Sequence, residues 1–270
     1  MSNGKRTLNR DSYTLNHPTI EEFVQAKKNA SGLTGSTIVS LLESGEIVDG
    51  LQVPWSSNST FLVRIKANPT KYFIGVYKPQ SGERPLHDFP SGSLYKRETA
   101  SFLLSRVLGW PNVPYTLIRN GPYGIGTIQL YIDHDPNVTY FDLLDGNSLK
   151  LQAFAVFDML INNADRKAGH CIVDKNGIIW SIDHGLTFHS FPKLRTVMLE
   201  LWGQPIPSSL LGSLEDLLKR LLSRAEGSLR LSTLLSQQEI NALIGRCQVL
   251  LKKPVLPKLD PFINTPWPLV

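Results

Sequence analysis

The sequence has little of what marks secreted, zinc-binding or membrane-spanning proteins. Its 270 residues contain two cysteines, Cys171 and Cys247, and these form no CxxC pair. Neither a disulfide framework nor a zinc site is therefore indicated, and a cytoplasmic location is expected. The polar stretch Met1–Asn16 lacks the apolar core of a signal peptide, and no uncharged run approaches the roughly 18 residues of a membrane span.

The bulk composition is that of a globular protein with a moderate positive charge. Hydrophobic residues make up 41% of the chain and the formal net charge is +5. This charge suits an acidic partner such as a nucleotide or an anionic membrane surface, and it does not select between them. We expect no nucleic acid among the partners.

Residue patterns predict an α+β chain with a strand-rich front half and a helix-rich back half. The segments with a β-branched and aromatic bias are 51–53, 60–66, 72–77, 115–118 and 126–132, and the predicted helices are 36–44, 94–108 and 148–161. The predicted domains are an N-terminal tail with a short helix at 1–33, a first lobe at 34–132, a second lobe at 133–253 and an irregular, Pro-rich tail at 254–270.

Turn and capping signals place further elements in the back half. Asn176-Gly177 suits the left-handed turn of a hairpin that joins strands at 172–173 and 178–182. The pairs Ser213/Asp216 and Ser236/Glu239 match the capping box, so they predict the starts of two later helices.

Two acids flank this hairpin, and their placement suggests chemistry. Asp165 follows the predicted helix 148–161, and Asp183 follows the second hairpin strand. Phosphoryl transfer needs one carboxylate to orient the acceptor hydroxyl and another to hold a divalent ion against the nucleotide phosphates. Arg166 would hold the first carboxylate or contact phosphate, and His170 would bind the ion together with Asp183. The ordinary alternative for Asp165 is a turn cap, and for His170 a structural loop residue.

The front half offers matching groups for an anion. Small polar residues lie between two predicted strands, where the backbone can curl around phosphate or form a plain polar turn: Ser56, Ser57, Asn58, Ser59 and Thr60. Lys78 ends the next strand and could grip a phosphate, or it could simply be solvated. Glu98, on the following helix, could fix this lysine as an ion pair, or lie on the surface beside Lys96 and Arg97.

A metal hydrolase is the competing chemical interpretation. Its ligands would be His170, Asp183, His184 and His189. The sequence lacks the His-x-x-x-His spacing that makes such a site convincing.

The order of these features resembles the signature set of protein kinases in an atypical form, without HRD or DFG. Two segments resemble type II phosphatidylinositol 4-kinases, which belong to the PI3/PI4-kinase-like superfamily. Residues 163–166 read Asn-Ala-Asp-Arg, where those kinases have Asn-Thr-Asp-Arg. Residues 182–188 read Ile-Asp-His-Gly-Leu-Thr-Phe, where those kinases have Ile-Asp-Asn-Gly-Leu-Ala-Phe. The resemblance is strongest to the bacterial SCO1664 family, over roughly residues 36–205. The blocks that carry it are 55–61, 82–86, 162–167, 183–186 and 192–196.

This resemblance implies a two-lobed kinase-like fold that uses ATP with Mg²⁺ or Mn²⁺. The loop Ser56–Thr60 would cover the phosphates, Lys78 would hold the α- and β-phosphates, and Glu98 would hold Lys78. Backbone groups of four residues would receive adenine: Gln129, Leu130, Tyr131 and Ile132. Asp165 would orient the acceptor and Asp183 would bind the metal. His170 stands where lipid kinases usually place an Asn ligand, and imidazole suits manganese better than magnesium.

The leading hypothesis is therefore an ATP-dependent phosphotransferase. A protein or small-molecule acceptor is favoured over a lipid, because the chain has no cysteine cluster for palmitoylation and no large amphipathic membrane helix. Two alternatives stay open: a pseudokinase that binds nucleotide or partners without turnover, and an adenylyl transferase on the same fold. The part of the chain beyond about residue 205 carries no chemical motif.

Overall fold

The structure is a computed structural model, and it describes residues 35–54, 56–223 and 230–270. The predicted N-terminal tail and short helix at 1–33 lie outside the described residues, as does Trp55. The described residues form two compact units. The first takes the residues up to Tyr95 together with Tyr115–Tyr131, and the second takes Lys96–Pro114 and Ile132–Val270.

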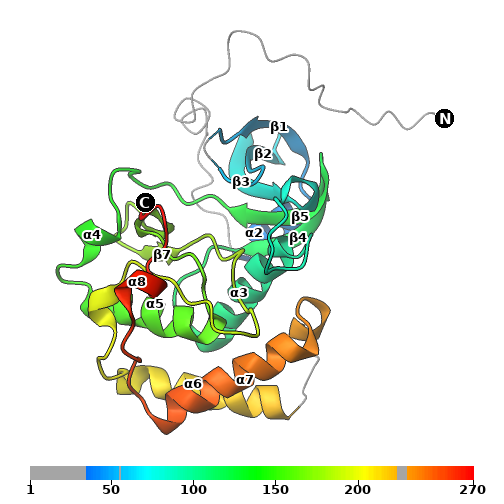
Figure 1. The fold of residues 1–270 in the computed structure, drawn as a ribbon. Helices are drawn as coiled ribbons and strands as arrows, with labels where there is room; N and C mark the ends of the chain where they lie inside the picture. Colours follow the sequence, from blue (N-terminus) through cyan, green and yellow to red (C-terminus); the bar gives the residue numbers. More distant parts are fainter. Residues whose placement is uncertain (1–34, 55, 224–229) are drawn as a thin grey trace. The chain divides into compact units, whose positions relative to one another are not determined.

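The first unit is built on an antiparallel sheet of five strands in the order β1-β2-β3-β5-β4 (Figure 1). Its strands are β1 (Ile47–Gln52), β2 (Phe61–Asn68), β3 (Lys71–Pro79), β4 (Thr116–Gly121) and β5 (Gly124–Leu130). Helix α2 (Gly35–Ser44) packs against β2, β4 and β5. Because hairpins join β2 to β3 and β4 to β5, the sheet needs only one long excursion, between β3 and β4.

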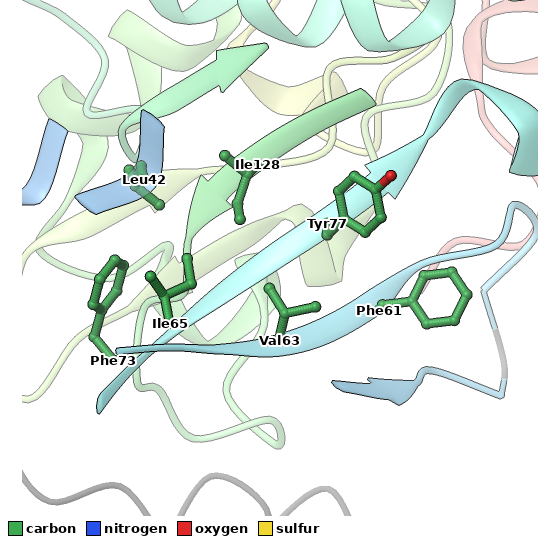
Figure 2. Close-up of a cluster of buried hydrophobic side chains, with 7 residues drawn as sticks. All are labelled: Leu42, Phe61, Val63, Ile65, Phe73, Tyr77 and Ile128. Atoms are coloured by element: carbon green, nitrogen blue, oxygen red, sulfur yellow. The ribbon is translucent and has the colours of Figure 1, made fainter. Parts of the chain in front are cut away.

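The core of this unit lies on one face of the sheet. Successive side chains of a strand point to opposite faces, so alternate residues of β2 and β3 share a face with β5 and α2. Figure 2 shows these buried side chains together: Leu42, Phe61, Val63, Ile65, Phe73, Tyr77 and Ile128. The Tyr77 hydroxyl donates a hydrogen bond of 2.6 Å to the Gly124 carbonyl. Leu62 and Ile74 form a smaller buried cluster.

The second unit is mainly helical. Its long helices are α3 (Leu94–Leu108), which begins within the first unit, α5 (Ser148–Ile161), α6 (Ser208–Leu222) and α7 (Gln237–Lys252). Its short elements are α4 (Tyr140–Leu143), α8 (Pro261–Asn264), the strands β6 (Cys171–Val173) and β7 (Ile179–Ser181), and 3-10 turns at 168–170, 199–201 and 231–233. Helices α6 and α7 lie side by side, and α7 also contacts α5 (Figure 1).

A buried ion pair connects α3 to the start of α7. Ser236 and Glu239 form the predicted capping box, in which each side chain bonds to the backbone N–H of the other residue. The Glu239 carboxylate also accepts a hydrogen bond from Arg97, a residue of α3 that is fully buried. The Arg97 guanidinium donates a further bond to the Thr187 carbonyl. These bonds fix the loop after β7 to both helices.

The α+β class, with strands in front and helices behind, is confirmed. The helices at 94–108 and 148–161 and the hairpin around Asn176-Gly177 are also confirmed. The helix start at Ser213 is wrong, because α6 begins at Ser208 and the Ser213 hydroxyl accepts a 2.7 Å bond from Trp110. The tail at 254–270 is not wholly irregular, since Asp260 caps helix α8. None of the described helices combines the length and apolar character that crossing a membrane requires.

Candidate active site

Helix α5 ends in an asparagine that organises the loop after it. Asn162 has a left-handed backbone (φ 53°), a conformation that Asn tolerates better than most residues. Its side-chain amide donates to the carbonyls of His189 and Phe191 and accepts from the Lys193 N–H, at 2.7–2.9 Å. The helix end therefore holds the segment 189–193 by one side chain.

Arg166 is the buried anchor of the same loop. Its side chain is fully buried, and the guanidinium binds both carboxylate oxygens of Asp158, at 2.7 and 2.8 Å. It also donates to the carbonyls of His170 and Ile182 and to the Ser181 hydroxyl. Burial alone would lower the pKa of Arg166, but the charge and hydrogen bonds of Asp158 raise it above its ordinary value. Arg166 therefore positions the loop, and the predicted contact with Asp165 or a phosphate is corrected.

Asp165 follows this scaffold and is partly exposed. Its backbone N–H donates to the Asn163 side chain at 3.0 Å, and Lys167 Nζ lies 3.6 Å from its carboxylate. Burial raises the pKa of Asp165, Lys167 lowers it, and the negative charge of Asp183 raises it again, so that the pKa lies above its usual value. The two predicted acids are thus close enough to interact electrostatically, and Asp165 has the raised proton affinity expected of a general base.

Asp183 leaves β7 in a left-handed conformation (φ 58°), and its carboxylate is about half exposed, at 49%. His170 Nε2 lies 3.4 Å from the Asp183 carboxylate. The other ring nitrogen, Nδ1, accepts a 3.3 Å bond from the Lys167 N–H, which leaves the proton of the neutral ring on Nε2. The His170 ring therefore lies beside the Asp183 carboxylate with Nε2 toward it, and its predicted role as a metal ligand stays a prediction.

The residues around Asp183 are fixed by Glu98. This glutamate is buried on α3, and its carboxylate accepts a 3.0 Å hydrogen bond from the backbone N–H of His184. The His184 ring is also buried and bonds to the Ser181 hydroxyl at 2.8 Å. Glu98 thus holds the turn that presents Asp183. Its predicted ion pair with Lys78 joins residues of the two units and stays a prediction.

The donor set fits one divalent ion of the Mg²⁺ type. Such an ion keeps several waters and binds through one or two carboxylates plus substrate phosphates, which matches the half-exposed Asp183. Among the described residues, no three His, Cys, Asp or Glu side chains gather around a common point. The hydrolase interpretation needed such a group. It would also need the His184 ring, which Ser181 and Arg166 already engage.

In the first unit, the predicted phosphate loop runs between β1 and β2. Ser56 and Thr60 share a hydrogen bond of 2.8 Å between their hydroxyls. The Asn58 side chain accepts from the Arg84 N–H, and the Ser59 N–H donates to the Gly82 carbonyl. These bonds shape the loop against the segment 80–84, while the Ser57 side chain is exposed.

Lys78 lies on β3 opposite Thr127 of β5 and is partly buried. A Cβ at Gly126 would lie 2.3 Å from the Lys78 carbonyl oxygen. The close approach of β5 to β3 at this position therefore requires glycine.

The predicted adenine-binding residues follow along β5. The N–H groups of Leu130 and Tyr131 already donate to the carbonyls of Tyr115 and Ile74, and the Gln129 amide donates to Thr116. These three donors are therefore engaged within the first unit, and the predicted contact of this segment with adenine stays a prediction.

Sequence reasoning missed the roles of Asp158, Ser181 and Glu83, and it considered His184 only as a ligand of the hydrolase alternative. Asp158 and Ser181 hold Arg166, His184 links Ser181 to Glu98, and Glu83 caps the start of α3 through the N–H groups of Leu94 and Tyr95. One signal was available for Asp158, because it is the single charged residue in the second half of the apolar helix α5. Glu83 lies within the block 82–86, which the resemblance included without a role.

Comparison with known proteins places the chain in a family. No family model matches it. The protein Rv2133c of Mycobacterium tuberculosis is 36% identical, over 84% of this chain and 94% of that protein. The chain belongs to the Rv2133c family. The similarity to the SCO1664 family and to phosphatidylinositol 4-kinases stays a prediction.

Solved structures similar to this member of the Rv2133c family are kinases and their relatives. A Golgi casein kinase with Mn/ADP bound matches with a TM-score of 0.54 at 15% identity, over 80% of this chain and 74% of that one. Hydra Fam20 with sugar matches with a TM-score of 0.51 at 16% identity, over 80% of this chain and 86% of that one. At these identities the likeness shows the fold, which is kinase-like.

Proposed function

We propose that this chain is an ATP- and divalent-metal-dependent phosphotransferase whose acceptor is a protein or a small molecule. The observation that carries the proposal is the pair of acids in the second unit. The backbone of Asp165 is bonded to the buried Asn163, and the turn after Asp183 is bonded to the buried Glu98. Burial, and then the charge of Asp183, raise the pKa of Asp165. A kinase needs one carboxylate near its acceptor and one at its metal. A kinase-like fold is an independent support.

The proposed roles follow from burial and charge. Asp165 accepts the proton of the acceptor hydroxyl, because its raised pKa increases its basicity. Asp183 holds the metal, which when bound neutralises charge on the phosphates, and His170 orients this carboxylate through Nε2–H. Lys78 and the loop Ser56–Thr60 receive the nucleotide phosphates in this proposal.

Manganese is the first metal to test. The Golgi casein kinase structure contains Mn and ADP, and the half-exposed Asp183 carboxylate is a ligand type that suits both Mn²⁺ and Mg²⁺.

The test uses ATP labelled at the γ-phosphate, with MnCl₂ or MgCl₂, and follows ADP release and label transfer to the chain itself or to added proteins. Asp165→Asn should keep metal-dependent nucleotide binding, seen as a thermal shift, and lose roughly 100-fold or more of the transfer rate. Asp183→Asn should lose the metal-dependent part of the thermal shift.

Asp145→Asn is the matched control, because Asp145 is an exposed acid of the same unit with no role in the site. Unchanged transfer in Asp165→Asn would reject the proposed base. Nucleotide binding without ADP release would identify a pseudokinase, and transfer of label from the α-phosphate would identify an adenylyl transferase.

A further inference from the structure

A concave site lies in the second unit, next to the end of α5. It is a cavity of about 620 Å³, within the range of pockets for small organic ligands. Four segments line it: the end of α5, residues 190–195, the middle of α7, and residues 257–264 around α8. The lining residues Val249 and Ile263 are largely exposed, so the cavity is open to solvent.

The walls of this cavity are mainly apolar. The hydrophobic lining side chains are Met159, Pro192, Leu194, Ala242, Val249, Pro257, Leu259 and Ile263. Gly245 of α7 adds an open stretch, because a Cβ placed there would meet no atom within 4 Å. A ligand with an apolar body would therefore be desolvated on several sides.

The charged groups of the cavity are all basic. Among the described residues, those that line it include Lys193, Arg195 and Arg246, and no aspartate or glutamate. Arg246 bonds through Nε to the Leu160 carbonyl at 2.8 Å and through Nη1 to the His189 carbonyl at 3.3 Å. Its Nη2 is buried and has no hydrogen-bond partner among the described residues.

A buried guanidinium nitrogen without a partner is costly, and an anion would relieve that cost. Burial lowers the pKa of Arg246 to about 10, and no carboxylate in the described part of the chain offsets this effect. The most direct compensation is an oxyanion bound at Nη2, because guanidinium groups pair well with carboxylate and phosphate.

We propose that this cavity binds a small organic anion with an apolar body, such as an alkyl carboxylate or alkyl phosphate, with its headgroup at Arg246. The site is separate from the proposed nucleotide and acceptor groups and does not depend on them. One wall of the cavity, residues 190–195, is bonded to the segment 162–166 that carries Asp165. Asn162 binds the backbone of 189–193, and Arg195 pairs through its backbone with Asn163 and Arg166.

The test is calorimetric titration of the full chain with decyl phosphate and decanoate, each below its micelle concentration. Decanol serves as the uncharged counterpart, and inorganic phosphate as the headgroup alone. Gly245→Leu should fill the cavity and weaken binding of decyl phosphate at least about tenfold, which corresponds to about 1.4 kcal/mol. Arg246→Met should remove the preference for decyl phosphate over decanol.

The matched control is Gly212→Leu, which makes the same change in the middle of α6, where a Cβ also meets nothing within 4 Å. Both leucine variants should melt no lower than the parent chain, because leucine favours a helix more than glycine does. The control should bind decyl phosphate like the parent.

Three results would overturn the proposal. The first is that the parent chain binds neither decyl phosphate nor decanoate. The second is that the parent and Gly245→Leu bind decyl phosphate equally well. The third is that the parent binds decanol as tightly as decyl phosphate. If inorganic phosphate alone bound as tightly as decyl phosphate, the assigned apolar body would be wrong. Because the readout is binding, these results are distinct from any failure of phosphate transfer.

Discussion

Replacing Asp158 by Asn should destabilise the second unit strongly, although this residue touches no proposed substrate group. The Asp158 carboxylate takes two hydrogen bonds from Arg166 and a third, of 2.9 Å, from the Asn163 amide. The substitution keeps the shape of the side chain but removes its charge. It also turns one acceptor into an NH₂ group that faces the donors of Arg166.

The magnitude follows from burial. Asp158 and Arg166 both have side chains that are 0% exposed. Removing one partner of such a pair leaves an uncompensated charge and typically costs about 3–5 kcal/mol. With a urea m-value of about 3 kcal/mol/M, this loss lowers the unfolding midpoint by about 1 M or more.

Tryptophan fluorescence during urea unfolding is a suitable assay, because four of the five tryptophans belong to the second unit: Trp110, Trp180, Trp202 and Trp267. The control is Asp216→Asn, which breaks the exposed pair between Asp216 and Lys219 on α6. An exposed pair contributes little, so this control should keep the parent's midpoint.

The reasoning about Arg166 fails if Asp158→Asn unfolds at the same urea concentration as the Asp216→Asn control. A lower midpoint with an unchanged slope is the expected outcome, since the slope reports the surface exposed on unfolding. Restoring stability by also replacing Arg166 with Met would show that the unpaired charge, and not lost packing, is the cause.

Two further predictions concern the site. Asp165 has a raised pKa in the folded chain, so its protonated form stabilises the fold below the unfolded pKa of about 3.9, and this stability is lost as pH rises through the folded pKa. Asp165→Asn should therefore be more stable than the parent at pH 7, with a difference that shrinks toward pH 4. A constant difference across urea titrations at several pH values would contradict this. Gly126→Ala should cost about 1–3 kcal/mol, because its Cβ would overlap the Lys78 carbonyl, and nucleotide affinity should fall with it. Gly212→Ala, with open space around its Cβ, is the control, and equal urea midpoints for the two alanine variants would refute the overlap.

Local signals in the sequence were sufficient for most of the fold. The asparagine–glycine turn, the capping box at Ser236 and the apolar run of α5 depend on neighbours within a few residues, and each is found as predicted. Ser213 shows the limit of this reasoning. Its spacing to Asp216 matches a capping box, but its hydroxyl bonds to Trp110, a residue distant in sequence. A four-residue motif contains no information about a hydrogen-bond partner that lies about a hundred residues away in the sequence.

The two acids of the candidate site could be predicted from the sequence, but the residues that hold their loops in place could not. Asp165 and Asp183 could be found because carboxylates in loops after buried elements suggest chemistry. The role of Arg166 depends on Asp158, whose position in a buried helix carries no local sign of its partner. The orientation of His170 depends on a backbone N–H, which no residue type reveals.

Residues 264–269 supply hydrogen-bond acceptors to the segment after Asp165 and to the segment that pairs with Arg166. The Ala168 N–H donates to the Leu269 carbonyl at 2.8 Å, and the Thr196 N–H donates to the Asn264 carbonyl at 2.7 Å. Both donors belong to fully buried residues. During synthesis from the N-terminus, these amides have no such acceptors until residues 264–269 have left the ribosome tunnel. The first unit, whose strands all precede residue 131, can therefore reach its native pairing before the segment that carries Asp165 acquires these hydrogen bonds.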